Sequence, residues 1–222
     1  MYDKSDPRAA LAPAAAGKPK TGLIAEEQLA TFYDSPPQIA DETGRTWLVR
    51  GHNFVVAYSD LKPGAVLTRS GQPDEYVVLL PDAGAEITAS GETRHVPANS
   101  IAFVPPGDSQ MVMPKGGNLV RLLTARSTDL VDLCPNAGAY DQPRTHIPEF
   151  QAWPEPADGL KIRHYSLDVP KQEGRFGRIF RCTTFMVNML DAYDGPRDTS
   201  KMSPHHHDDF EQCSLLLEGQ YT

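Results

Sequence analysis

Residues 75–113 read EYVVLLPDAGAEITASGETRHVPANSIAFVPPGDSQMVM, a series of short apolar runs separated by turn residues. The separators PDAG, SGE and PPGD each carry glycine or proline, the residues that tight turns between strands require. The same texture continues on both sides and predicts short strands at residues 47–51, 54–60, 65–69, 75–81, 85–90, 93–97, 100–105, 109–114 and 118–126. Short strands at this spacing are typical of an all-β fold, an antiparallel sandwich or barrel of roughly 90 residues.

The composition is that of an ordinary soluble protein, with 222 residues, 23% of them charged and 40% hydrophobic. The net charge of -8 argues against an electrostatic nucleic-acid binder, because such proteins neutralise phosphates with clustered basic residues. No apolar run reaches the roughly 18 residues of a membrane-spanning helix, and the N-terminus lacks the apolar segment of a signal peptide. We therefore expect a cytoplasmic protein without nucleic-acid or membrane partners.

The cysteines of the chain are Cys134, Cys182 and Cys213. They are too few and too widely spaced for a disulfide framework or a CxxC zinc site. We expect buried free thiols instead.

The segments outside the predicted strands differ from them in composition and in the spacing of apolar residues. Residues 1–22, rich in Ala, Pro and Lys, are expected to form a disordered leader, and residues 23–33 predict a short helix. Residues 131–159 contain several prolines and little alternation, as a linker would. Strand-like runs resume within residues 160–222 and predict a second β unit, with strands at 161–169, 178–190 and 211–219.

The second unit contains SPHHHDDFEQCSLLLEG (residues 203–219), in which histidines and carboxylates precede an apolar run. If this stretch is extended, alternate side chains share a face, and His205, His207 and Glu211 lie on the side that Leu215 and Leu217 mark as interior. Two imidazoles and a carboxylate on one face can bind a divalent first-row metal and leave coordination positions open. The alternative is a polar loop whose histidines titrate in solvent.

The spacing His205-x-His207-x3-Glu211, with Gly219 beyond it, resembles the first motif of the cupin superfamily, G-x5-H-x-H-x3,4-E-x6-G. The leading glycine is absent, and the last gap holds seven residues rather than six. The resemblance implies that His205, His207 and Glu211 hold one divalent transition metal (Fe, Mn, Ni or Zn) inside a small β-barrel. It also implies a fourth ligand, expected beyond residue 222.

The region of the first nine predicted strands is similar to the same family, with the ligands replaced. Setting Glu75 opposite Glu211 places Arg69 and Gly71 at the two histidine positions. The stretch from Asn99 to Gln110 is similar to the second cupin motif, with Gln110 at the position of its histidine.

The resemblance implies a bicupin, built of RmlC-like jelly-roll (double-stranded β-helix) barrels in tandem. Residues 45–130 would form an N-terminal barrel without metal ligands, and residues 160–222 the first half of a metal-binding C-terminal barrel. Residues 131–159 would link them. Because a cupin barrel needs further strands after its first motif, the chain is interpreted as a fragment of a longer protein.

The function implied by the resemblance is that of a metal-dependent enzyme, a dioxygenase or an isomerase acting on a small organic molecule. The alternative is a non-catalytic bicupin that binds or stores a small ligand, which the loss of ligands in the first barrel favours. A third interpretation is a purely structural β protein with surface histidines. Dimers are common for this fold class, so a homodimer is a further expectation.

Overall fold

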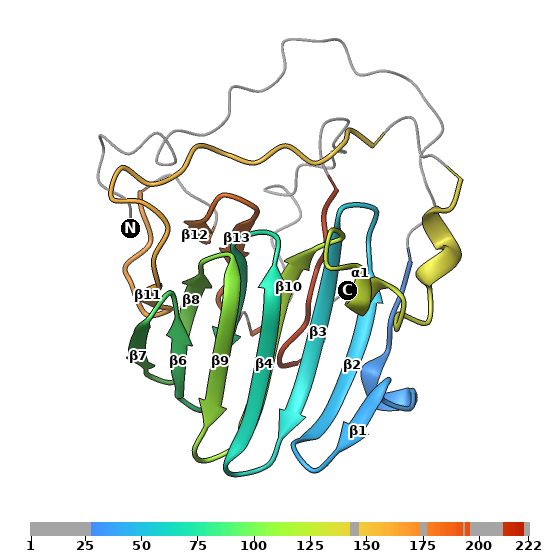
Figure 1. The fold of residues 1–222 in the computed structure, drawn as a ribbon, viewed down its shortest axis with the longest axis horizontal. Helices are drawn as coiled ribbons and strands as arrows, with labels where there is room; N and C mark the ends of the chain where they lie inside the picture. Colours follow the sequence, from blue (N-terminus) through green and yellow to red (C-terminus); the bar gives the residue numbers. More distant parts are fainter. Residues whose placement is uncertain (1–27, 143–146, 174–176, 193, 196–210, 220–222) are drawn as a thin grey trace.

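The computed structural model describes residues 28–142, 147–173, 177–192, 194–195 and 211–219. Antiparallel strands make up most of this part of the chain (Figure 1). The elements are η2 (Phe32–Asp34), β1 (Ile39–Asp41), β2 (Gly44–Arg50), β3 (Phe54–Leu61), β4 (Ala65–Gln72), β5 (Tyr76–Leu80), β6 (Ala85–Ala89), β7 (Glu92–Val96), β8 (Ser100–Val104), β9 (Gly107–Met113), β10 (Gly117–Thr124), α1 (Thr128–Val131), η3 (Ala137–Tyr140), β11 (Arg163–Ser166), β12 (Arg178–Arg181) and β13 (Met186–Met189). Within these residues, no helix has the length and apolar character needed to cross a membrane.

The strands predicted between residues 47 and 126 are confirmed: each has its counterpart among β2 to β10, with bounds that differ by a few residues at most. The turns predicted from glycine and proline lie between them. Strand β1, which pairs with β2, has no counterpart in the prediction.

Strands β3 to β10 are arranged in the order of a jelly roll. They are divided between two sheets, which run β1-β2-β3-β10-β5-β8-β11 and β4-β9-β6-β7. Strand β3 pairs with β10, β4 with β9, β5 with β8 and β6 with β7, so that each inner pair is nested within the next one out. This nesting describes a long hairpin rolled into a sandwich, and it supports the predicted jelly-roll fold for this region.

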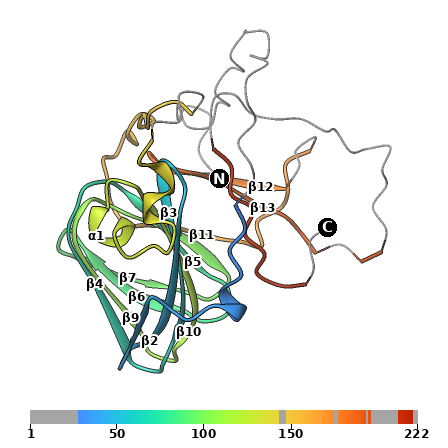
Figure 2. The same cartoon turned by 90° about the vertical axis from the view of Figure 1, so that its right-hand side faces the viewer.

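The main core lies between the two sheets, which face each other in Figure 2. Alternate residues of β5, for example Tyr76, Val78 and Leu80, point into it together with Ile87 of β6 and Met111 of β9. All of these side chains are almost completely buried. The period of two therefore assigns an inner and an outer face to every strand of the sandwich.

A second core covers the outer face of the seven-stranded sheet. Val77 and Leu79 of β5 point into it and pack with Phe180 and Cys182, which belong to the C-terminal part of the chain. Strand β11 extends this sheet by pairing with β8, and the hairpin β12–β13 lies on the same side (Figure 2). The C-terminal segment thus forms a layer on the jelly roll, and the predicted second barrel stays a prediction.

Three predicted elements differ in the structure. The strand predicted over residues 178–190 is two strands, β12 and β13, which pair as a hairpin. Residues 28–31 contain no helix, and the only helical residues of the predicted helix 23–33 that are described belong to the short turn η2; residues 23–27 lie outside the described residues. Residues 211–219 contain no strand, and Leu216 and Leu217 are 51% and 40% exposed. Leu215 alone of this apolar run packs against the second core.

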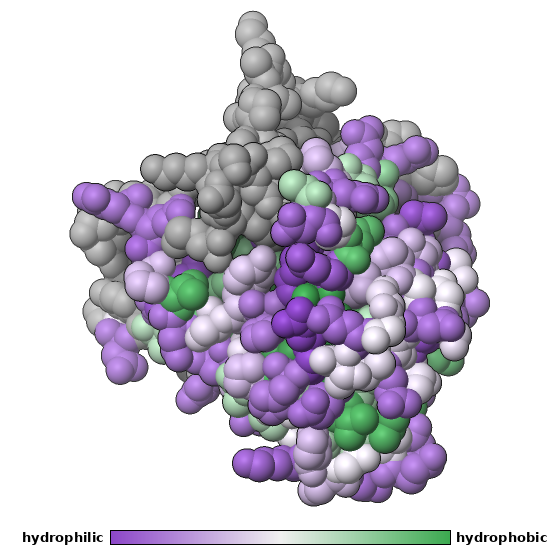
Figure 3. Space-filling view, turned by 60° about the vertical axis from the view of Figure 1, so that its left-hand side comes forward, coloured by the Kyte–Doolittle hydropathy of each residue, from purple (hydrophilic) through white to green (hydrophobic). Residues whose placement is uncertain are grey.

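The surface seen in Figure 3 is mostly hydrophilic in its described part, with apolar residues in small separate areas. Cys134 and Cys182 are buried free thiols, as predicted, whereas Cys213 is exposed because it lies in the segment that forms no strand.

Candidate functional site

Of the three predicted metal ligands, His205 and His207 lie outside the described residues, and only Glu211 can be located. Its carboxylate lies at the turn between β2 and β3, where Oε1 accepts a hydrogen bond from the backbone N–H of His52 (2.6 Å) and Oε2 accepts one from that of Asn53 (2.7 Å). Both bonds are short, as expected when the acceptor is charged. Glu211 therefore ties the segment that follows the histidines to one end of the sandwich.

The carboxylate of Glu211 is suited to binding a metal. An ionised carboxylate has about four acceptor positions, and the two backbone N–H groups use one on each oxygen. Carboxylates that bind metals are commonly held by such hydrogen bonds. Within the described part of the chain, no cluster of three His, Cys, Asp or Glu side chains could hold a metal on its own. The metal site thus stays a prediction that depends on His205 and His207.

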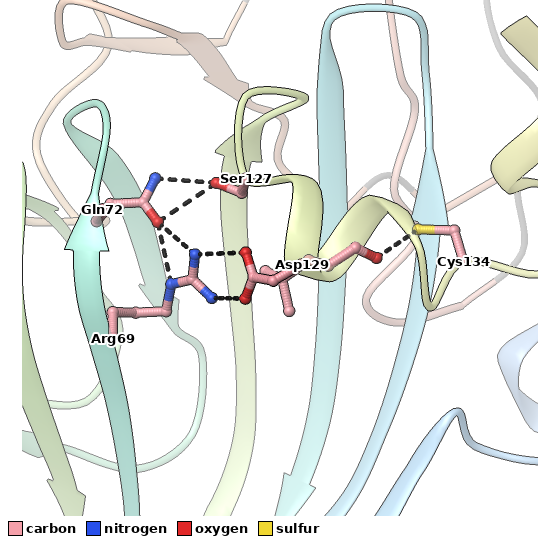
Figure 4. A network of polar contacts seen from close by, with 6 residues as sticks. Arg69, Gln72, Ser127, Asp129 and Cys134 are labelled. Atoms are coloured by element: carbon pink, nitrogen blue, oxygen red, sulfur yellow. Dashed lines mark hydrogen bonds and ion pairs between the residues drawn. The ribbon is translucent and has the colours of Figure 1, made fainter. Parts of the chain in front are cut away.

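The same end of the sandwich contains a polar layer in its interior, centred on Arg69 of β4. The Arg69 side chain is 10% exposed and pairs with Asp129 of α1 through two contacts, Nη1–Oδ2 at 2.5 Å and Nη2–Oδ1 at 3.1 Å. It also donates to Oε1 of Gln72, at 3.0 Å from Nε and 2.8 Å from Nη2, and Gln72 donates to Oγ of Ser127 at 3.0 Å (Figure 4). This network joins β4 to the chain that follows β10.

The positions of the jelly roll that were aligned with metal ligands do not converge on one point. Arg69 faces the interior, but Gln110 is exposed, and its neighbour Ser109 is the buried residue of β9 opposite Arg69. Gly71 is exposed and has a left-handed backbone (φ +59°) in a bulge of β4, where the register with β9 shifts. The alignment of Gln110 with a metal-binding histidine is therefore wrong by one strand position, because a shift of one residue reverses the face.

Glu75 faces outward from the seven-stranded sheet, away from the interior that contains Arg69. It is 1% exposed and forms an ion pair with Arg163 of β11. Its Oε2 accepts hydrogen bonds from the backbone N–H (2.8 Å) and the hydroxyl (3.0 Å) of Thr183. Glu75 therefore fastens the C-terminal layer to the sandwich and does not contribute to the interior polar layer.

A second arginine, Arg121 of β10, completes the interior layer. Its neighbours on the inner face of β10 are Leu119 and Leu123, and the whole residue is 6% exposed. Tyr76 and Ser109 lie in the same layer and share a hydrogen bond between their hydroxyl groups (2.9 Å). Among the described residues, Arg121 forms no hydrogen bond or ion pair, and its Nε is buried without a partner.

The electrostatics of the layer reflect two positive charges close together. Burial lowers the pKa of the Arg121 guanidinium, and the charge of Arg69 lowers it further, while Tyr76 and Asp129 oppose the shift. Burial raises the pKa of the Tyr76 hydroxyl, and its bond to Ser109 and the two arginines oppose that shift. The hydrogen bonds from Arg69 lower the pKa of Asp129. The layer can therefore attract an anion and donate hydrogen bonds to it.

The sequence gives only a weak signal for Arg121. It interrupts the apolar run NLVRLLTAR, where β10 is apolar on both faces, so alternation alone does not tell which way the arginine points. Only the packing of Leu119 and Leu123 into the main core assigns Arg121 to the interior.

Comparisons with known proteins give neither a family nor a function for this chain. A scan against protein-family models finds no match, and a search of curated proteins finds none either. Solved structures similar to part of the chain include an RmlC-like cupin from Shewanella frigidimarina (17% identity, TM-score 0.42, 47% of this chain and 96% of that one). They also include KdgF from a Halomonas species (15% identity, TM-score 0.41, 47% of this chain and 98% of that one).

A variant of oxalate decarboxylase from B. subtilis is also similar, with 14% identity and a TM-score of 0.39 over 46% of this chain and 30% of that one. All three likenesses extend over less than half of the chain. The evidence for a jelly roll is the nested strand order of the two sheets.

Proposed function

We propose that this chain is a cupin-type protein that acts on a small organic molecule and holds one divalent transition metal with His205, His207 and Glu211. The observation that supports it is the state of Glu211, a carboxylate at the ligand spacing of the motif that is fixed by two backbone N–H groups and keeps acceptor positions free. When bound, such a metal supplies Lewis-acid polarisation of a substrate oxygen, as used by oxygenases and isomerases.

Metal analysis of the purified protein tests this proposal. The wild type should contain about one metal per chain, and the His205→Ala/His207→Ala double variant should contain almost none, because removing two of three ligands weakens metal binding severely. His95→Ala/His164→Ala is the matched control, since both histidines are exposed on strands of the sandwich. Equal metal content in the wild type and the His205→Ala/His207→Ala variant would disprove the site.

A second candidate function is non-catalytic binding of a small ligand by the sandwich itself. The buried Arg121 without a partner among the described residues favours it, because a polar interior is unexpected in a fold whose only role is structural. The two functions separate by turnover: the metal-loaded protein, mixed with catechols, keto acids and sugars, should consume oxygen or convert a substrate if it is an enzyme. Saturable binding without conversion would favour the binding function.

A further inference from the structure

Among the described residues, the positive charge of Arg121 has no counter-charge in contact with it. The guanidinium of Arg69 is matched by Asp129, and that of Arg126 by Asp74 (Nη1–Oδ1 2.7 Å). Arg121 is more deeply buried than either and has no carboxylate partner among the described residues. An arginine remains charged in proteins, and burying an unpaired charge is costly, so a mobile anion is the partner to expect.

The groups around Arg121 suit the carboxylate of an organic acid. The planar fork of a guanidinium matches the two oxygens of a carboxylate, and the Tyr76 and Ser109 hydroxyl groups lie in the same layer as further donors. One uncompensated positive charge calls for a single negative one. The next inward layer is apolar, with Leu67 of β4 paired opposite Met111 of β9, and would contact the hydrocarbon part of the ligand.

We propose that the interior of the jelly roll binds a small organic monocarboxylate, with Arg121 as its charge partner. The ligand lies in the polar layer at the end of the sandwich beside α1, next to the ion pair of Arg69 and Asp129. Asp129, 62% exposed, forms the outer rim of the site. This inference deepens the ligand-binding function proposed above and does not depend on the metal.

The test measures the melting temperature and the dissociation constant of the full chain with propionate, propionamide and chloride at constant ionic strength. Propionate should raise the melting temperature in a saturable manner, because a ligand that binds only the folded state stabilises it. Propionamide has the same shape without the charge and should have almost no effect. Equal effects of propionate and propionamide would overturn the proposal, and so would chloride acting as strongly as propionate, which would show an adventitious ion only.

Variants locate the site. Arg121→Gln removes the charge partner and should weaken propionate binding by about tenfold or more. Arg45→Gln is the matched control, because Arg45 lies in the same sheet but is exposed and paired with Asp60. Asp129→Asn removes the competing carboxylate and should strengthen binding severalfold, a gain that a misfolded protein cannot give. Propionate binding unchanged in Arg121→Gln, or weakened in Asp129→Asn, would contradict the assignment.

Metal content and propionate binding test the metal site and the carboxylate site independently of each other. Metal content, measured in the same preparations, should be unaffected by Arg121→Gln and abolished by His205→Ala/His207→Ala. If Arg121→Gln does not fold, Tyr76→Phe tests the site instead: it removes one hydroxyl donor and should weaken propionate binding severalfold while propionamide stays without effect. Binding of propionate that is undiminished in Tyr76→Phe would then overturn the proposal.

Discussion

Glu75 and Arg163, 88 positions apart in the sequence, form an ion pair between the end of the turn before β5 and strand β11. The Glu75 side chain is completely buried there, and Thr183 donates two further hydrogen bonds to it. The pair joins β11 to the start of β5 within the seven-stranded sheet, and the hydrogen bonds from Thr183 tie Glu75 to the C-terminal layer.

Glu75→Gln should lower the free energy of unfolding by about 3 to 5 kcal/mol, because it leaves the Arg163 guanidinium buried without its counter-charge. Urea unfolding at neutral pH measures this. Asp158→Asn, which breaks the exposed pair with Lys161, is the control and should cost less than about 1 kcal/mol. A similarly small loss in Glu75→Gln would mean that the pair does not hold the C-terminal layer in place.

The pair of Asp129 and Arg69 should give a pH-dependent contribution to stability. Hydrogen bonds from Arg69 hold the pKa of Asp129 below its ordinary value of 3.8. A carboxyl group whose pKa is lower in the folded state stabilises that state above its unfolded pKa, and the contribution is lost as the pH falls through the folded pKa.

Asp129→Asn should therefore lower the free energy of unfolding by at most about 1 kcal/mol at neutral pH, since Asp129 is largely exposed. The difference from the wild type should shrink as the pH falls from about 4 through the lowered pKa of folded Asp129, below which both proteins lack the charge. Urea unfolding at several pH values measures it. A difference that stays constant down to acidic pH would argue against an ionic origin.

Glu211 should stabilise the turn between β2 and β3 whether or not a metal is bound. Glu211→Ala removes the acceptor for the backbone N–H groups of His52 and Asn53 and should cost about 1 to 2 kcal/mol in EDTA-treated protein. Glu218→Ala, at an exposed position of the same segment, should change the free energy of unfolding by less than about 0.5 kcal/mol. Equal effects of the two variants would contradict the anchoring role.

The thiols should differ in reactivity. Burial raises the pKa of Cys134 and of Cys182 to about 11. Cys213 is exposed, although partial desolvation raises the pKa of its thiol as well. A reagent can reach only an exposed thiol, so the native protein should react with Ellman's reagent at about pH 8 mainly at Cys213. The unfolded protein should react at all three. Cys213→Ser should abolish the native reaction, and a second fast thiol would contradict the burial of the others.

The jelly roll was predictable because its turns are marked by glycine and proline and its strands are short and regular. The run YVVLL of β5 is apolar at every position, which indicates burial on both faces. The sequence did not predict which residues cover the outer face of the seven-stranded sheet. The covering residues, such as Phe180 and Cys182, follow more than 50 positions after β10 and have no recognisable pairing pattern. Long-range packing of this kind leaves no local signature.

The candidate sites were predictable to different degrees. The spacing of His205, His207 and Glu211 is a local pattern, yet the strand expected to carry it is not formed over residues 211–219. An apolar run predicts a strand only when partner strands are available, and Leu216 and Leu217 instead face solvent. The interior site around Arg121 was missed because alternation in a strand that is buried on both faces does not distinguish the two sides.

The seven-stranded sheet has no solvent side over β5 and β8: one face meets the opposite sheet and the other meets the C-terminal layer. A shortened chain ending after η3 would retain all of β1 to β10 but leave Val77, Leu79 and Phe103 uncovered. Its strand β8 would also lose β11 and become an open edge, a surface to which other copies can add strands. We therefore expect such a shortened chain to be less stable and more prone to association than the chain that includes the C-terminal layer.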